Sequence, residues 1–337
     1  AILSLVSNTL VPMGGPVPAS SVGGGAAWGF GRSILMEGRP CLIADIATLS
    51  DRTLGMAVQA ACEQPNGSGS QQIAVDGSHQ WAPRLRQGKH LVPLVEASGE
   101  QPRVVPLTAF VTGGLGGLGI SLAPFLMARG ASKVVLTSRG GQVARGGQGL
   151  DQLLQKLLTQ SGQHVITRAC DSSSIFELIS LLALSDSQEQ CGLIHMPHVN
   201  FDAMLTNIQI AQVSPLLSAK AGSAWRATAV LAQRPLMYGV LFSSGAAFGA
   251  FGASLHAAGN SYLDALSTFE MSNGASWRSV IIPLIRGAGA GEATFKAQAE
   301  RGDAAVLAAF ISVDELAACL MMALQGDACT RAPVAPS

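Results

Sequence analysis

The sequence predicts an α/β protein built on a Rossmann-like, doubly wound parallel sheet. Short apolar segments of strand character alternate with helical segments along most of the 337 residues, and this alternation is typical of βαβ units in a parallel sheet. A glycine-rich segment, 112–119, lies between one such strand and the helix that follows it. That context favours a nucleotide-binding turn over a flexible linker.

The composition limits the class of partner. Only 12% of the residues are charged, 48% are apolar and the formal net charge is zero, so we expect large buried faces and no surface for nucleic acid. The best candidate for a membrane span, 304–324, is interrupted by Asp314 and Glu315, so we expect none. The six cysteines are scattered without a C-x-x-C pair, which predicts free thiols in a reducing cytoplasm and no metal site.

The first residue is Ala1, and no charged side chain precedes Arg32. We therefore expect no signal peptide, and we interpret the sequence as a piece of a longer protein.

Residues 1–104 are predicted to form a smaller α/β part. Strands are expected at 2–6 and 41–46, with a hairpin of 72–75 and 80–85 around Asp76-Gly77. Helices are expected at 26–37, after a Gly/Pro/Ser-rich connection, and at 54–63. No glycine-rich turn follows the first strand, so this part is predicted to be structural. Arg32 and Glu37 are interpreted as solvated or locally paired.

Residues 105–337 are predicted to hold the main sheet. Strands are expected at 107–111, 133–137, 164–169, 192–195, 238–242 and 279–283. Helices are expected at 118–129, 150–160 and 254–271, and Pro215 is expected to open a long helix that contains Lys220. Ligands bind such sheets at the carboxyl ends of the strands. We expect residues 112–119, 138–139, 171, 195–198 and 243–256 to converge there.

The glycine-rich segment predicts a cradle for a pyrophosphate. Glycines let the backbone approach the anion closely, and the N-terminus of the next helix offers unpaired N–H groups and a positive dipole end. The residues predicted to form this cradle are Thr112, Gly113, Gly114, Leu115, Gly116, Gly117, Leu118 and Gly119.

The ends of the next two strands predict the choice of dinucleotide. An acidic residue after the second strand would hold the ribose 2′-hydroxyl of NAD(H). This chain has Ser138 and Arg139 there, which favour the 2′-phosphate of NADPH. Asp171 follows the third strand and is predicted to meet the adenine ring.

In combination, these motifs resemble the ketoreductase domains of type I polyketide synthases and related fatty-acid synthases, which are extended short-chain dehydrogenases/reductases. In the first half the resemblance rests on residues 28–32, Glu37, 43–45, 75–77 and 82–85. In the second half it rests on 112–119, 136–139, 242–244 and 260–266. It implies a truncated Rossmann-like structural subdomain (1–104) that binds no cofactor, followed by a catalytic NADPH-binding subdomain (105–337).

The resemblance implies reduction by NADPH of a β-ketoacyl thioester on an acyl carrier protein, inside a megasynthase with further domains. In this family a tyrosine phenol gives a proton to the developing alkoxide, a lysine lowers the phenol's pKa and a serine holds the substrate oxygen. By position the lysine is Lys220, the serine Ser243 and the asparagine after the tyrosine Asn260. His195 falls beside the cofactor.

The position of the family tyrosine, thirteen residues after Ser243 and four before Asn260, holds His256. A histidine can donate a proton, but its nitrogen reaches roughly 2 Å less far than a phenol oxygen, and a misplacement of about 1 Å can cost about a hundredfold in rate. Tyr262 faces another side of the same helix, and Tyr238 lies inside a strand.

Other departures from the family fall on the nicotinamide and substrate side. They are Met196-Pro197-His198, the stereochemical fingerprint Asn200-Phe201-Asp202, Phe251, Leu255 and Ile285-Arg286. Two interpretations therefore stay open, an NADPH-dependent ketoreductase and a non-reducing ketoreductase-like scaffold that keeps NADPH binding. A third is a free-standing dinucleotide-binding regulator.

Overall fold

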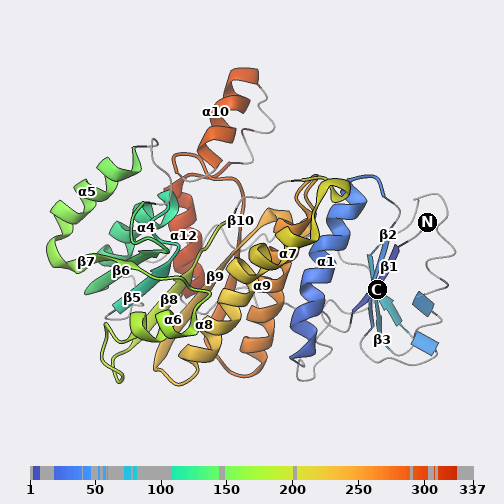
Figure 1. Cartoon of the computed structure of the whole chain (residues 1–337), viewed down its shortest axis with the longest axis horizontal. Coiled ribbons are helices and arrows are strands. Elements are labelled where there is room, and N and C mark those ends of the chain that lie inside the picture. The colour runs from blue at the N-terminus through green and yellow to red at the C-terminus, as the bar shows by residue number, and fades with distance from the viewer. Residues whose placement is uncertain are drawn as a thin grey trace. The chain divides into compact units, whose positions relative to one another are not determined.

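The computed structural model of the chain describes residues 3–7, 19–39, 41–46, 52–53, 56–57, 59, 72–76, 79–81, 108–143, 149–199, 203–288, 291–302, 307 and 310–324. Contacts divide the chain into two compact units, each built from several sequence segments (Figure 1). The first unit comprises Ala1–Gly99, Asn200–Leu217 and Ala246–Gly274, and the second comprises Glu100–Val199, Ser218–Gly245 and Ala275–Ser337. The boundary at residue 104 stays a prediction.

The second unit is built on a six-stranded sheet. Its strands are β5 (Thr108–Thr112), β6 (Lys133–Ser138), β7 (Val165–Ala169), β8 (Cys191–His195), β9 (Leu236–Ser244) and β10 (Trp277–Ile282). They lie in the order β10-β9-β8-β5-β6-β7, with every neighbouring pair parallel. The strand order reverses between β5 and β8, which is where doubly wound sheets bind dinucleotides. The predicted Rossmann-like fold is confirmed.

Helices cover the sheet of the second unit. They are α4 (Gly117–Ala128), α5 (Leu150–Ser161), α6 (Ile175–Leu182), α8 (Ser223–Leu231) and α12 (Val313–Leu324). Helix α10 (Gly291–Arg301) belongs to the same unit but projects away from the sheet (Figure 1). Leucines of α4, α5 and α12 share one core with alternate residues of β5, β6 and β9, whereas α8 packs on α6 and β9. Because β5 and β8 are buried along their whole length, they are apolar on both faces.

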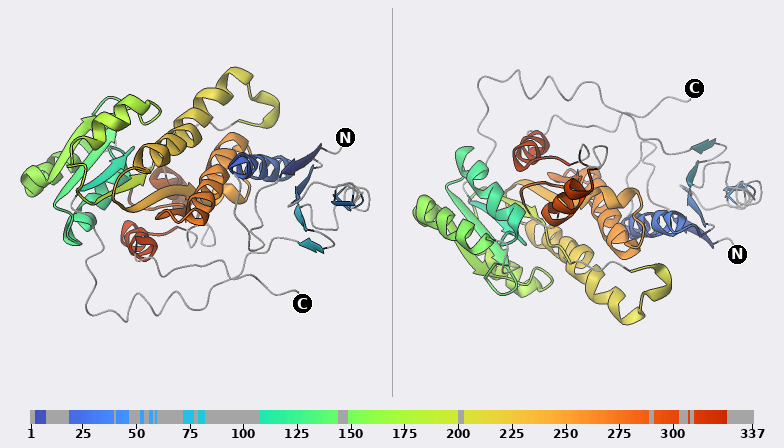
Figure 2. Two further views of the ribbon diagram at one scale, coloured as in Figure 1. Left: turned by 90° about the horizontal axis from the view of Figure 1, so that it is seen from below. Right: turned by 90° about the horizontal axis from the view of Figure 1, so that it is seen from above.

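The first unit has its own small sheet. Strands β1 (Leu3–Ser7), β2 (Cys41–Ile46), β3 (Gln72–Asp76) and β4 (His79–Trp81) lie in that order. The first three are parallel, and β3 and β4 form the predicted antiparallel hairpin. Its helices are α1 (Ser20–Met36), α7 (Ile210–Leu217) and α9 (Ser254–Ser272), and α1 lies beside α9 (Figure 2).

Helix α1 begins earlier than predicted, at Ser20 rather than residue 26. Gly25, in the segment expected to be a connection, and Gly29, in the predicted helix, both face α9. A Cβ on Gly25 would overlap the side chain of Ala265, and a Cβ on Gly29 would overlap the backbone oxygen of Ala257. Close packing between the helices outweighs the low helix propensity of glycine here.

The helix around Lys220 also differs from the prediction. Helix α7 begins at Ile210 and contains Pro215 in its interior, so Pro215 does not open it. Lys220 lies in a π-helical segment, η3 (Ser218–Gly222), which joins α7 directly to α8, so the long helix expected around Lys220 is present but contains a π-helical turn. Helices α6, α10 and α12 were not predicted. Of the helix expected at 54–63, the described residues 56, 57 and 59 are helical.

Arg32 and Glu37 form hydrogen bonds to groups remote in the sequence, which their interpretation as solvated or locally paired did not include. Arg32 Nη1 donates to the carbonyl oxygen of Ala247 at 2.8 Å, 215 residues away. Both carboxylate oxygens of Glu37 accept from the N–H of Leu205, 168 residues away. The sequence could not indicate these pairs, because their partners are backbone groups remote in sequence.

Within the described part of the chain, no helix combines the length and the apolar character that crossing a bilayer needs. Cys41, Cys170, Cys191 and Cys319 are free thiols. The other two cysteines, Cys62 and Cys329, lie outside the described residues.

Candidate active site

The segment 112–119 connects β5 to α4 in a tight turn. Gly113 has a φ of +71°, which favours glycine, and a Cβ there would lie 2.9 Å from the carbonyl oxygen of Met196. A Cβ on Gly119 would overlap the backbone of Gly114. Glycine is thus required at these positions for close backbone packing, as in turns that receive a dinucleotide.

The turn leads directly into the N-terminus of α4. Gly116 is the N-cap, with an extended backbone and no side-chain cap. The first N–H groups of a helix have no acceptor within it, and its N-terminal dipole end attracts anions. Leu115 is fully buried and its N–H donates to the carbonyl oxygen of Thr137 at 3.2 Å. The loop is therefore anchored to β6 and fits a pyrophosphate.

Ser138 shapes the end of β6. Its hydroxyl donates to the carbonyl oxygen of Gln142 at 2.6 Å, and its own carbonyl accepts from the N–H groups of Gly141 and Cys170. Arg139 follows and is exposed. The turn therefore offers a guanidinium to solvent at the carboxyl end of the sheet.

Asp171 lies at the neighbouring strand end. Its Oδ1 accepts from the N–H and the hydroxyl of Ser173, at 2.9 and 2.7 Å. These bonds lower the pKa of Asp171, and the charges of Arg139 and Arg226 lower it further. The carboxyl group is ionised at neutral pH and lies in the field of Arg139.

The strands β5 and β8 end side by side at the reversal of strand order. Thr112 pairs with His195, and Thr112 Oγ1 lies 2.8 Å from His195 Nδ1. On the other side of the ring, His195 Nε2 lies 3.0 Å from Ser223 Oγ, which donates to the carbonyl oxygen of Ala219 at 2.7 Å. Since a hydroxyl has one proton, Ser223 accepts from Nε2–H and Nδ1 accepts from Thr112.

His195 is neutral in this setting. Burial and, to a smaller extent, the charge of Lys220 lower the pKa of His195 to about 3, against the opposing effect of a hydrogen bond with the Lys220 backbone. Both ring nitrogens have protein partners, which join β5 to the segment that carries Lys220. Contact between His195 and a cofactor stays a prediction.

Lys220 lies in the π-helical segment η3, and its residue is 9% exposed. Such segments occur often at functional sites. Ser223 Oγ also lies 3.1 Å from the Lys220 carbonyl oxygen. Ser243, the other predicted catalytic residue of this unit, lies near the end of β9 and is buried. Sequence reasoning missed Ser223, since a helical serine gives no signal of such a role.

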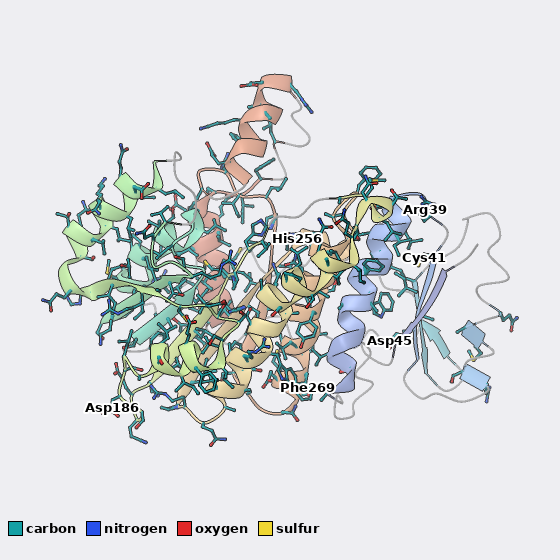
Figure 3. All side chains as sticks on the ribbon, in the orientation of Figure 1. Arg39, Cys41, Asp45, Asp186, His256 and Phe269 are labelled. Carbon is teal, nitrogen blue, oxygen red and sulfur yellow. The ribbon has the colours of Figure 1, made fainter. Side chains whose placement is uncertain are left out.

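His256 and Asn260 lie on α9 of the first unit, one helical turn apart. Asn260 Nδ2 donates to the carbonyl oxygen of His256 at 2.8 Å. Figure 3 places His256 and Phe269 toward opposite ends of α9. The roles of both residues stay predictions.

Neither Tyr238 nor Tyr262 lies at the sequence position of the family tyrosine, and we expect neither to replace it. Tyr262 follows His256 by six residues, about 240° around the helix, and burial raises its pKa. Tyr238 packs its ring where a Cβ on Gly192 would lie, and burial raises its pKa as well. Tyr238 lies within the sheet of the second unit, so its phenol is part of a core.

The segment after β8 packs against the glycine turn. Met196 N–H donates to the Thr112 carbonyl oxygen at 3.0 Å, and a Cβ on Gly113 would lie 3.0 Å from Pro197 Cα. The fingerprint positions Asn200, Phe201 and Asp202 lie outside the described residues. Among the described residues, no group of three or more metal-ligating side chains could hold a metal ion.

Comparison with known proteins gives consistent matches. The family model of the KR domain matches residues 108–287. A solved A-type ketoreductase from a modular polyketide synthase is similar with a TM-score of 0.78 at 29% identity, over 97% of this chain and 67% of that one. An A1-type ketoreductase is similar with a TM-score of 0.78 at 28% identity, with the same 97% and 67% covered.

Curated relatives are far longer than this chain. Polyketide synthase GfsA of Streptomyces halstedii is 32% identical over 253 residues, which are 73% of this chain and 3% of that protein. Naringenin synthase of Pestalotiopsis fici is 29% identical over 259 residues, which are 74% of this chain and 9% of that protein. The chain thus spans less than a tenth of the length of either relative.

Proposed function

The chain belongs to the KR-domain family of polyketide synthase ketoreductases, and from this premise we propose that it binds NADPH and reduces a β-ketoacyl thioester to a β-hydroxyacyl thioester. The observation that carries the proposal is the glycine turn 112–119, which opens α4 where the strand order of the sheet reverses. The substrate is carried by an acyl carrier protein, and other megasynthase domains are its neighbours. Residues 1–104 are the structural part and 105–337 the cofactor-binding part.

The residues at the strand ends fit NADPH. Backbone N–H groups at the start of α4 receive the pyrophosphate. The guanidinium of Arg139, in the turn that Ser138 shapes, pairs with the 2′-phosphate, and the ionised Asp171 accepts from the adenine amino group. A bound NADPH supplies the hydride.

The side chains of this protein would then control charge on the substrate oxygen. Ser243 donates a hydrogen bond to the ketone oxygen, and the Lys220 ammonium stabilises the negative charge that develops there. His256, in the place of the tyrosine, delivers the proton. A neutral imidazole is a poor acid, so His256 must be an imidazolium to serve, and a typical histidine titrates at about 6.5.

A second candidate function is a non-reducing domain that keeps NADPH binding. The replacement of the family tyrosine by His256 favours it, because an imidazole is shorter than a phenol. The sequence Met196-Pro197-His198 favours it as well, since this segment is bulkier than the small residues of the family.

Two measurements separate these functions. NADPH is titrated into the protein while nicotinamide fluorescence is followed; the absence of saturable binding contradicts both. Reduction of a simple β-ketoacyl thioester is then assayed for the wild type, His256→Phe and His256→Tyr. Wild-type turnover that His256→Phe abolishes supports the reductase. Turnover only in His256→Tyr supports the non-reducing domain, and no turnover in any variant makes the 196–198 segment the suspected second block.

A further inference from the structure

Two polar side chains of α1, Arg32 and Ser33, and that of its C-cap residue, Glu37, hold two remote segments of the first unit. Besides the bonds of Arg32 and Glu37, Ser33 Oγ accepts from the Ala250 N–H at 3.1 Å. We call residues 203–207 the turn segment and residues 246–253 the loop segment. Glu37 binds the turn segment through Leu205, at 2.9 and 3.2 Å. Arg32 and Ser33 bind the loop segment.

The guanidinium of Arg32 is fixed on several sides. Its Nε donates to Gln72 Oε1 at 2.9 Å, and its Cζ lies 5.1 Å from the ring centre of Trp28 and 5.9 Å from that of Phe248. The oxygen that it binds, that of Ala247, also accepts from the hydroxyl of Ser261 on α9 at 3.1 Å. The carbonyl oxygen of Ala247, in the loop segment, therefore accepts hydrogen bonds from both α1, through Arg32, and α9, through Ser261.

The two segments also meet each other. Ala203 and Ala253 form a parallel β-bridge, so a shift of one segment is transmitted to the other. Gly249 in the loop segment has a φ of +108°, and a Cβ there would lie 3.1 Å from the Arg32 carbonyl oxygen. The loop segment is thus fitted to the surface of α1.

Both segments adjoin positions that the family resemblance assigns to the substrate side. The turn segment follows Asn200-Phe201-Asp202, and the loop segment leads from β9 into α9, where His256 lies. None of the glycine turn 112–119, Arg139 or Asp171 belongs to these segments.

We propose that Arg32, Ser33 and Glu37 are positioning residues, which set the turn and loop segments and through them the substrate side of the domain, without acting on NADPH. The structural part of the chain thereby takes part in substrate selection. This consequence rests on the proposed reductase or NADPH-binding function, whereas the positioning itself does not.

Hydrogen exchange tests the positioning without any turnover. In Glu37→Ala the amide of Leu205 loses a charged acceptor, so exchange in peptides covering 203–207 should accelerate about tenfold or more. In Ser33→Ala the acceleration should fall on peptides covering 246–253. Arg39→Ala, which removes an exposed charge at the same end of α1, is the control and should change neither. Unchanged exchange at 203–207 in Glu37→Ala overturns the proposal. Equal acceleration at 203–207 and in the buried strand 108–112 also overturns it, because it would show a general loss of stability.

The effect on substrate binding and turnover is measured in whichever protein reduces the thioester, the wild type or the His256→Tyr variant. Glu37→Ala should raise KM for the thioester or lower kcat at least fivefold, while the Kd for NADPH stays within twofold of the parent. Glu37→Gln keeps an oxygen acceptor and should recover part of the loss. A weakened NADPH affinity in Glu37→Ala contradicts the proposal. Absent NADPH binding in the parent contradicts the proposed function and leaves the exchange result valid.

Discussion

Thr112 and His195, 83 residues apart in the sequence, end neighbouring strands and share a buried hydrogen bond of 2.8 Å. Through Ser223, the same imidazole reaches the backbone beside Lys220. The first residue of the glycine turn and the predicted catalytic lysine are thereby linked through two side chains, the neutral imidazole of His195 and the hydroxyl of Ser223. Any change in the protonation of His195 disturbs both ends of this link.

Stability should fall as the pH drops below 6.5, because His195 must stay neutral. Its folded-state pKa is lowered to about 3, whereas an unfolded histidine titrates at about 6.5. Between these values the unfolded chain binds more protons, so stability rises with pH by up to about 1.4 kcal/mol per unit for this group. Above 6.5 the contribution is complete.

Urea unfolding of wild type and His195→Gln at pH 7, 6 and 5 measures this effect. The variant should be less stable at pH 7 by about 2 kcal/mol, since Thr112 and Ser223 lose their partner. It should also lose most of the wild-type slope between pH 6.5 and 5. Asp171 does not interfere, because its lowered pKa places its titration below that window. Equal slopes in both proteins would show that the imidazole of His195 titrates normally.

Two glycines of α1 should respond in opposite directions to the same substitution. Gly23 is exposed and a Cβ there meets no atom within 4 Å, so Gly23→Ala should stabilise the protein by up to about 1 kcal/mol. Gly29→Ala would push a methyl group into the Ala257 backbone and should destabilise it by about 2 kcal/mol or more. Thermal unfolding of both variants measures the difference, and a stabilised Gly29→Ala contradicts the α1–α9 packing.

Arg139→Ala should change the preference between dinucleotides. Loss of a charge-assisted bond to the 2′-phosphate should weaken NADPH binding about tenfold to a hundredfold and leave NADH binding nearly unchanged. Fluorescence titrations with both dinucleotides give the ratio. The matched control is Arg129→Ala, which removes a cation at the C-terminal end of α4 and should alter neither affinity. Equal weakening of NADPH and NADH by Arg139→Ala contradicts recognition of the 2′-phosphate.

Tyr238→Phe should be neutral or stabilising by about 1 kcal/mol. The hydroxyl of Tyr238 is buried and has no hydrogen-bond partner among the described residues, so its removal relieves a desolvation cost. NADPH affinity should stay unchanged, and so should any turnover. Lost turnover would identify Tyr238 as a proton donor, against its place in the core.

The sequence predicted those elements whose signals are local. The strand expected at 133–137 is β6 (Lys133–Ser138) in the structure, because a buried parallel strand must be apolar on both faces. The glycine turn was predicted because its signal is local as well: the strand, the glycines and the helix follow one another directly in the sequence.

The remainder depends on contacts between remote segments. The start of α1 at Ser20 follows from packing against α9, some 230 residues later, which no local propensity encodes. The π-helical segment around Lys220 has no known residue signature. The interpretation of Arg32 and Glu37 missed their partners, because Ala247 and Leu205 offer backbone groups that leave no trace in the sequence and Gln72 is 40 residues away from Arg32. The pairing of His195 with Ser223 was missed likewise.

The first unit is assembled from separate segments of the sequence, and this affects where chimeric chains can be joined. Helix α1 comes from the start of the chain, and α9, on which its glycines pack, comes from residues 254–272. A crossover at residue 104 would therefore join an α1 from one parent to an α9 from another. Recombinants made there should lose yield unless both parents carry glycine at positions 25 and 29 and equally small residues at 257, 261 and 265.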